Sequence, residues 1–251
     1  MPEFSYPVPS LPLPIPAQAD VWELPVTAAA PHLALWAQWL SPEEQQRAAR
    51  FYRAADRDRF ILSRGGLRAL LGRYHQCPPQ HLRFTYGAYG KPALAAGGSL
   101  QFNLAHSEDW ILYAMAQQRV IGVDVEQIKD RSHLEGLIER CLTPEEQKHL
   151  PPATGDRLTA FLRHWTVKEA HLKAMGQGLS YAMNQVEIRW QPTLAMVRPA
   201  RWDGQRFRGW TLHCWQPSPG TWAALCLEGA GGAITRRPFP LPDGELLRYG
   251  H

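Results

Sequence analysis

The sequence predicts an α+β fold built from two similar halves, and three observations support this. Residues 41–45 (Ser-Pro-Glu-Glu-Gln) recur 102 positions later as residues 143–147 (Thr-Pro-Glu-Glu-Gln). Each copy has the hydroxyl, proline and glutamate of a capped helix start, although capping boxes can also recur by chance. A longer helical pattern follows each copy, and strand-like runs follow each helix. We therefore expect two halves packed face to face around a cleft, a common place for ligands.

The two long helical patterns extend from Asp56 to Gly72 and from Asp156 to Gly176. Each ends at a glycine, the residue that most easily adopts the left-handed conformation found after helices. In the second pattern apolar residues recur at helical spacing, and Glu169 falls within their stripe. A carboxylate in an apolar stripe needs a partner, so Glu169 is a candidate for function.

Three strand-like runs follow each long helix. Turn signals at Gln117-Gln118 and at residues 217–220 separate neighbouring runs, which favours antiparallel meanders over parallel βαβ units. The expected strands are residues 100–104, 111–116 and 120–125 in the first half, and 186–190, 210–215 and 222–227 in the second.

The expected organisation is a lead-in (1–17), a first α+β half (18–125), a second half (126–228) and a tail (229–251). Six prolines between positions 2 and 16 favour an extended lead-in, held loosely against the rest. Because residues 229–242 are rich in glycine and proline, we expect the chain to leave the packed domain there.

Composition indicates an ordinary globular protein. The chain has 251 residues, of which 45% are hydrophobic, and its net charge of +4 is too small to indicate a nucleic-acid binder. Four widely spaced cysteines suggest neither a zinc site nor a disulfide framework. No run resembles a membrane span or a signal peptide, so we expect a cytoplasmic protein with reduced thiols and no membrane partner.

Two carboxylates end the strand-like run at residues 122–126. Alternation along a strand sends Val123 and Val125 into the core and places Asp124 and Glu126 together on the other face. At about 7 Å apart and an effective dielectric of roughly 20, their repulsion costs on the order of 2 kcal/mol. Either the two acids face water at a strand end, or a cation such as a divalent metal compensates them.

For Glu169 on the second long helix, a structural and a functional interpretation are again both possible. Lys173 lies one turn after Glu169, so the two could form a simple surface ion pair. Alternatively, Glu169 joins Asp124 and Glu126 around Mg²⁺, which prefers oxygen ligands, while Lys173 neutralises a phosphate. His106, at the end of a strand expected beside the Asp124 strand, is either a polar cap or a further phosphate contact.

Four motifs together resemble the 4'-phosphopantetheinyl transferases of the Sfp (surfactin-synthetase-activating) type. They are Gly-Lys-Pro at 90–92, Phe-Asn-x-x-His-Ser at 102–107, Gly-x-Asp-x-Glu at 122–126 and Trp-x-x-Lys-Glu-Ala-x-x-Lys at 165–173. The resemblance covers roughly residues 33–227, and Ala170 is typical of the W/KEA subgroup. It implies a monomeric, pseudo-twofold fold with the active site between the two halves.

The resemblance also implies roles for individual residues around coenzyme A. Two positions depart from the pattern: Ala105 stands where many relatives have serine, and Glu44 where some have lysine. Both departures concern nucleotide binding and leave the metal site untouched. The implied roles are Mg²⁺ ligation by Asp124, Glu126 and Glu169, pyrophosphate contacts by Lys173 and His106, nucleotide contacts by Lys91 and Pro92 with the backbone of Ala105, and 3'-phosphate contacts by Arg47 and Arg59.

The implied reaction moves the 4'-phosphopantetheine arm of coenzyme A to a serine of an acyl or peptidyl carrier protein and releases adenosine 3',5'-bisphosphate. Glu169 would take the serine proton, directly or through a metal-bound water. Two rivals remain open at this point. A metal-dependent phosphohydrolase or nuclease could use the same acids, and a catalytically silent carrier- or RNA-binding module would not need them.

Overall fold

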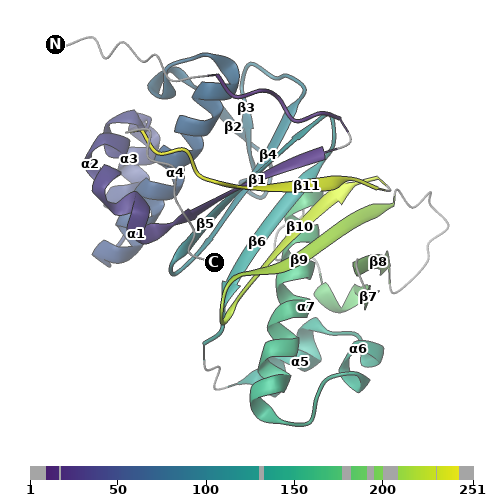
Figure 1. Ribbon diagram of the computed structural model, residues 1–251. Helices are drawn as coiled ribbons and strands as arrows, with labels where there is room; N and C mark the ends of the chain where they lie inside the picture. Colours follow the sequence, from purple (N-terminus) through teal and green to yellow (C-terminus); the bar gives the residue numbers. More distant parts are fainter. Residues whose placement is uncertain are drawn as a thin grey trace.

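The computed structural model describes residues 10–16, 18–129, 133–176, 182–190, 195–199, 209–229 and 231–242, with residues 195–199 described by their backbone. Two sheets lie side by side, with helices α1 to α4 against the first and α7 along the second (Figure 1). The strand order is β11-β1-β5-β4 in the first sheet and β6-β10-β9-β8-β7 in the second, and β2 and β3 form a separate hairpin. The predicted α+β class is therefore confirmed.

The first half contains β1 (Gln18–Pro25), α1 (Val26–Ala29), η1 (Ala30–His32), α2 (Leu33–Trp39), α3 (Pro42–Ala49), α4 (Ala54–His75), η2 (Pro79–His81), β2 (Phe84–Tyr86), β3 (Pro92–Leu94), β4 (Leu100–Ser107) and β5 (Trp110–Gln117). The remainder contains β6 (Ile121–Gln127), α5 (Leu134–Cys141), α6 (Pro144–Lys148), α7 (Thr154–Met175), η4 (Met183–Gln185), β7 (Val186–Trp190), β8 (Ala195–Pro199), β9 (Trp210–Ser218), β10 (Thr221–Glu228) and β11 (Ala233–Pro238). All six expected strands are present.

The repeated sequence motif forms the same structure twice. Helices α3 and α6 both begin with a complete capping box, and in both the glutamate of the box is buried. Each of these glutamates then pairs with a cation on the following long helix. The Glu44 Oε2 atom accepts from Arg68 Nε at 2.7 Å, and Glu146 Oε2 accepts from Lys168 Nζ at 2.6 Å. The buried pairs fix the short helix to the long helix in each half.

Helices α4 and α7 each have 22 residues and end at a left-handed residue, Gln76 and Gly176 respectively. The prediction that Gly72 ends the first of them is wrong. Gly72 lies inside α4, where the backbone carbonyl of Cys77 occupies the space that a Cβ atom would need. The glycine thus serves a close approach of the chain that follows the helix, and Gln76 makes the turn.

The boundary between the halves lies between β5 and β6. Strand β6 pairs antiparallel with β10 in the second sheet, and the turn at Gln117-Gln118 carries the chain from one sheet to the other. The expected division after residue 125 therefore falls inside β6. The antiparallel meander prediction holds for the β4–β5 and β9–β10 hairpins, but does not extend from β5 to β6.

Residues 233–242 belong to the packed domain, so the expectation that the chain leaves it after residue 229 is wrong. Strand β11 pairs in parallel with β1, and Phe239 is fully buried. Glycines with positive φ precede the strand and allow the turn that brings it back. The last nine residues, 243–251, lie outside the described residues.

The proline-rich lead-in is described only in part. Residues 1–9 and 17 lie outside the described residues. Within residues 10–16, the Leu11 amide donates to the carbonyl oxygen of Arg73 at 3.4 Å, and Pro14 is buried. This part of the lead-in is therefore held against the end of α4. No helix in the described ranges is long and apolar enough to cross a membrane.

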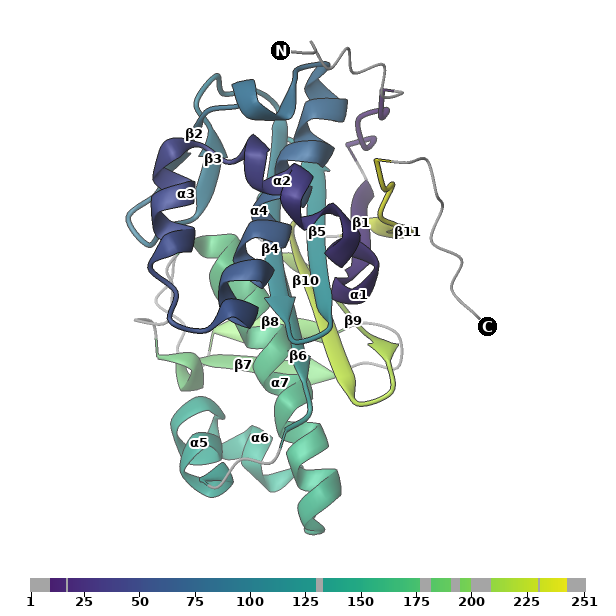
Figure 2. The same ribbon diagram turned by 90° about the vertical axis from the view of Figure 1, so that its left-hand side faces the viewer.

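One apolar core joins the two sheets. It is formed by small and branched side chains of β1, β4, β5, β6 and β10. Strands β4 and β6 lie side by side (Figure 2), but no backbone ladder pairs them among the described residues. Side chains connect them instead. The Val123 amide donates to Asn103 Oδ1 at 2.9 Å, and the Gln127 amide donates to Ser107 Oγ at 3.2 Å. This seam places the ends of β4 and β6 next to each other.

Candidate active site

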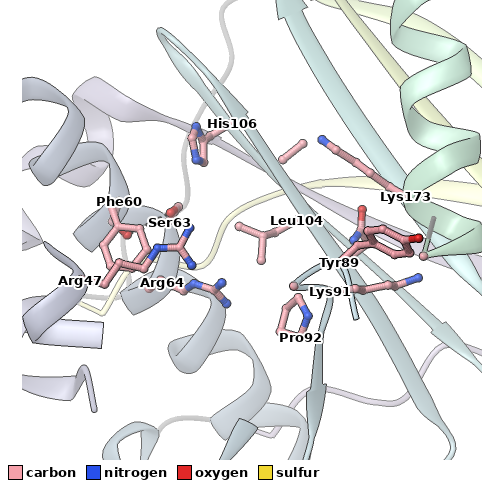
Figure 3. A pocket seen from close by; sticks show the side chains of 14 residues that line it. Arg47, Phe60, Ser63, Arg64, Tyr89, Lys91, Pro92, Leu104, His106 and Lys173 are labelled. Atoms are coloured by element: carbon pink, nitrogen blue, oxygen red, sulfur yellow. Dashed lines mark hydrogen bonds between the residues drawn. The ribbon is translucent and has the colours of Figure 1, made fainter. Parts of the chain in front are cut away.

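A cavity of about 310 Å³ opens where helices α3 and α4, the loop before β3, the end of β4 and the end of α7 meet (Figure 3). Its wall is strongly basic. Six residues implicated from the sequence line this one cavity: Arg47, Lys91, Pro92, Ala105, His106 and Lys173. Asp124, Glu126, Glu169 and Arg59 do not belong to its described lining.

Lys173 connects the cavity to the carboxylates behind it. Its Nζ atom donates to Asp124 Oδ1 at 2.6 Å, so the Lys173 ion pair crosses from α7 to β6 and does not follow the helix to Glu169. Asp124 is only 4% exposed. Burial raises the pKa of Asp124 to about 6, although Lys173 acts in the opposite direction. The other oxygen, Oδ2, has no hydrogen-bond partner among the described residues.

Glu169 is in a similar position on the facing helix. It is 9% exposed, and its Oε1 atom has no partner in the described part of the chain. Burial raises the pKa of Glu169, Lys173 lowers it, and Glu126 raises it further. Glu126 itself accepts a hydrogen bond from Trp165 Nε1 at 3.2 Å. Glu169 thus interacts electrostatically with Lys173, Asp124 and Glu126.

The carboxylates do not gather around a single point. Within the described ranges there is no group of three or more His, Cys, Asp or Glu side chains arranged to hold a metal ion. The Lys173 ammonium pairs with Asp124 Oδ1, so Oδ2 is the oxygen of that carboxylate without a partner among the described residues. The donors nevertheless suit magnesium, because two buried carboxylates each keep an oxygen without a partner among the residues described.

His106 lies at the end of β4, and its side chain points toward the cavity (Figure 3). Although the residue is exposed overall, desolvation in the cavity and then the nearby cations Lys173, Arg59 and Arg64 lower the pKa of His106 to about 4. The imidazole is therefore neutral near pH 7 and can donate or accept. A phosphate beside it would favour the protonated form.

Lys91 is held more firmly than the sequence indicated. Its Nζ atom donates to the carbonyl oxygens of Ile121 and Ala174, both at 3.0 Å. Burial lowers the pKa of Lys91 to about 8. The side chain thus fixes the loop before β3 to both β6 and α7, while its stem lines the cavity. Its contact with the nucleotide stays a prediction.

The two arginines expected near the 3'-phosphate differ in position. Arg47 lines the cavity with its guanidinium 5.2 Å from the centre of the Phe60 ring. Arg59 pairs with Asp56 at 3.2 Å and Glu108 at 3.5 Å. It contributes to the charge near His106 but not to the described lining of the cavity.

The two departures from the family pattern also have structural explanations. Glu44, which stands where some relatives have lysine, accepts hydrogen bonds through Oε2 from its capping box and from Arg68, while Oε1 has no partner among the described residues. Ala105 is buried against the core shared by the two sheets, with a place in the cavity wall. A buried acid in a capping box cannot contact a nucleotide phosphate favourably, so nucleotide binding on this side depends on other residues.

Sequence reasoning missed several residues of the cavity wall. They are Phe60, Ser63, Arg64, Tyr89 and Asn103. Arg64 carries a signal that could have been found, because it lies one turn after Phe60 and three residues before Leu67 in the apolar stripe of α4. A charged residue in an apolar stripe needs a partner for its charge, as Glu169 does on α7.

Two family models match the chain and together cover both halves. The 4'-phosphopantetheinyl transferase N-terminal model matches residues 27–118, and the 4'-phosphopantetheinyl transferase superfamily model matches residues 120–226. The 4'-phosphopantetheinyl transferase HetI of Nostoc is 36% identical over 220 residues, which cover 85% of this chain and 89% of that protein. The chain belongs to the 4'-phosphopantetheinyl transferase superfamily. The two matched ranges meet between β5 and β6, where the structure divides the transferase halves.

Other transferases of the family match over a shorter range. The 4'-phosphopantetheinyl transferase Sfp of Bacillus subtilis is 32% identical over 152 residues, covering 60% of this chain and 66% of that protein. Among solved structures, the holo-[acyl-carrier-protein] synthase of Thermotoga maritima matches 44% of this chain and 64% of its own, with 21% identity and a TM-score of 0.37.

Proposed function

We propose that this transferase moves the 4'-phosphopantetheine arm of coenzyme A to a serine hydroxyl of an apo acyl or peptidyl carrier protein and releases adenosine 3',5'-bisphosphate. One observation carries the proposal. A basic cavity at the junction of the halves lies against two buried carboxylates that keep oxygens without partners among the described residues. Coenzyme A carries a pyrophosphate and a separate 3'-phosphate, and a cavity lined by Arg47, His106 and Lys173 suits these anions.

Asp124, Glu126 and Glu169 would hold a magnesium ion. Supporting this, burial raises the pKa of both Asp124 and Glu169, so a bound cation would relieve an unfavourable arrangement. When bound, the ion would supply positive charge beside the pyrophosphate. Lys173 would then be free to leave Asp124 and contact a phosphate oxygen.

The chain's own groups are placed for the remaining steps. Lys173 and His106 lie on the cavity wall, where they can stabilise charge that develops on the departing bisphosphate. Glu169, a buried carboxylate with one oxygen that has no partner among the described residues, is the group that we expect to take the serine proton. The positive net charge favours association with acidic carrier proteins in the cytoplasm, where we expect the transferase to act as a monomer.

The test is incubation with coenzyme A, Mg²⁺ and a panel of apo carrier proteins, read by the mass of each carrier. We expect one phosphopantetheine arm per carrier, and no loading after Mg²⁺ is removed by a chelator. Asp124→Asn and Glu169→Gln should each abolish loading, whereas Glu145→Gln, on the exposed face of α6, should load normally.

Near-normal loading by either variant at millimolar Mg²⁺ would disprove the metal assignment. Hydrolysis of coenzyme A without any carrier would favour the phosphohydrolase, and Mg²⁺-independent binding of a carrier without transfer would favour a silent binding module.

A further inference from the structure

Arg64 is a buried cation on the cavity wall that the assigned roles do not use. It lies on α4, is 7% exposed and belongs to the lining of the cavity. Its Nη1 atom has no hydrogen-bond partner anywhere in the described part of the chain. Leaving a buried charged donor without a partner costs more than a neutral one. An arginine in this position therefore indicates a partner that the described residues do not supply.

The charges around Arg64 do not balance. Glu44 is the carboxylate whose field reaches it, and Arg47 and Arg68 are the nearby cations. The Glu44 Oε2 atom accepts from Arg68 Nε at 2.7 Å and from the Ser41 amide at 3.0 Å, and Glu44 Oε1 makes no hydrogen bond to Arg64 or to any other described residue. One carboxylate thus faces three guanidinium groups. The surplus of positive charge lies at the cavity.

Aromatic rings hold two of these guanidinium groups on the wall. The Phe60 ring centre lies 5.2 Å from the guanidinium carbon of Arg47 and 6.0 Å from that of Arg64, and the Tyr86 ring centre lies 5.7 Å from Arg64. Contacts with ring faces orient cations without consuming their N–H donors. Arg47 and Arg64 can therefore both present donors to the same ligand group.

This pair lies across the cavity from the other cationic end. Figure 3 shows Arg47, Arg64 and Phe60 on the side of α3 and α4, and Lys173 on the opposite side with α7. A cavity with positive charge at two separated ends suits a ligand with two separated anionic groups. The surplus at the Arg47 and Arg64 end suits a phosphate monoester, which carries nearly two negative charges near neutral pH.

We propose that Arg64, with Arg47 beside it, binds the 3'-phosphate of coenzyme A and selects against donors that lack this phosphate. The inference rests on the proposed function and adds a specificity-determining residue to it. Arg64 Nη1 donates to a phosphate oxygen, and the bound dianion offsets the surplus charge that faces Glu44. Arg59, engaged with Asp56 and Glu108, does not take this role.

The first measurement is calorimetric binding of adenosine 3',5'-bisphosphate and of adenosine 5'-monophosphate, which differ by the 3'-phosphate alone. The wild type should prefer the bisphosphate, and Arg64→Met should reduce that preference by roughly 10- to 100-fold while affinity for the monophosphate stays nearly constant. Arg57→Met, on the exposed part of the same helix, is the matched control and should keep the preference. An unchanged preference in Arg64→Met, or an equal loss for both nucleotides, would overturn the proposal.

The second measurement separates binding from folding. In thermal melts without ligand, Arg64→Met should be at least as stable as the wild type, because it removes a buried charge that lacks a full set of partners among the described residues. The bisphosphate should raise the melting temperature of the wild type more than that of the variant. A lower melting temperature with an intact preference would show that Arg64 only supports the fold. If Arg64→Met does not fold, Arg64→Gln and Arg64→Lys are measured in the same way and decide by the same preference.

Carrier loading distinguishes failure of this inference from failure of the proposed function. If the wild type loads no carrier with either coenzyme A or 3'-dephospho-coenzyme A, the proposed function is wrong. If it loads with coenzyme A, Arg64→Met should raise KM for coenzyme A but not for the dephospho form, with kcat nearly constant for both. An equal rise in KM for both donors would refute the role of Arg64 and leave the function in place.

Discussion

Lys173 shows how one residue can serve both stability and chemistry. Replacing it with methionine leaves the buried Asp124 carboxylate without its cation, and we expect unfolding free energy to fall by on the order of 2 kcal/mol, since Lys173 is partly exposed. Loading should also slow by roughly 10- to 1000-fold, the value of one charged donor to a transition state. Urea unfolding and carrier-loading kinetics measure the two effects.

The double variant Asp124→Asn/Lys173→Met separates these effects. It should regain part of the lost stability, because position 124 no longer carries a buried charge without its cation, yet it should remain inactive. Normal loading by Lys173→Met would exclude Lys173 from the chemistry.

A second residue, His171, should contribute to the response of the fold to acid. His171 on α7 is 4% exposed, meets Trp210 edge-on at 5.1 Å, and neither ring nitrogen has a partner among the described residues. Burial lowers its pKa from 6.5 to about 4. The unfolded chain therefore binds this proton more readily, so stability present above pH 6.5 is lost as the pH falls toward 4, by about 3 kcal/mol in total.

Denaturant unfolding between pH 4 and pH 7 tests this expectation. His171→Phe, which keeps an aromatic ring, should reduce the pH dependence, while His149→Gln on the surface should not change it. A slope that is unaffected by His171→Phe would show that other groups cause the acid sensitivity.

At the residue scale, the sequence predicted the site where the chemistry lies at the ends of elements. Alternation along a strand singled out Asp124, helical spacing singled out Lys173 beside Glu169, and His106 was expected at the end of a strand; their roles stay predictions. Lys91 could not be understood in this way, because its partners are the backbone carbonyls of Ile121 and Ala174, distant along the chain. Such contacts follow from the tertiary arrangement and leave no periodic signal.

At the element scale, the packing of β6 on α7 depends on Gly122. A Cβ atom at this position would overlap the backbone of Ala170 and Ala174. Gly122→Ala should therefore push the strand from the helix and displace Asp124 from Lys173, costing about 1–3 kcal/mol or more of stability and most of the activity.

The matched control is Gly136→Ala on α5, where no described atom lies within 4 Å of the added Cβ. This change should stabilise the protein slightly, by about 0.5–1 kcal/mol. Melting temperatures and loading rates of both variants provide the comparison. Wild-type stability and activity in Gly122→Ala would show that β6 can move without affecting the site.

Sequence patterns identified the elements whose formation depends on residues close together in the chain. The capping boxes of α3 and α6 and the alternating or continuous apolar runs of β4, β5, β9 and β10 are visible in short windows. Strand β11 was missed because its pairing with β1 depends on residues more than two hundred positions away. Its glycine- and proline-rich surroundings indicated a tail, and only the parallel partner makes it a strand.

At the scale of the whole molecule, β11 completes the first sheet and balances buried acids on β1. Arg236 donates to both oxygens of Glu23, at 2.7 and 3.1 Å, and Arg237 donates to Asp20 at 3.1 Å. Truncation after residue 229 removes these cations and the buried Phe239. Loss of a buried phenylalanine alone costs about 3–5 kcal/mol, so we expect a strongly lowered melting temperature and aggregation through the open edge of β1.

Truncation after residue 242 is the control, because it keeps β11 and Phe239. Differential scanning calorimetry and size-exclusion chromatography of both truncated proteins test the prediction. If the protein truncated after residue 229 stayed monomeric and unfolded cooperatively at the normal melting temperature, β11 would be dispensable.

The parallel pairing of β1 with β11 has a consequence for synthesis on the ribosome. Residues 18–25 emerge early, whereas their partner, residues 233–238, emerges only after both long helices and nearly all other strands have been made. During that time β1 is the edge of an incomplete sheet, with Asp20 and Glu23 lacking their arginines. Translation therefore delivers a first half that remains open to wrong pairing until the final strand arrives, and native closure of that sheet can only follow the synthesis of residue 238.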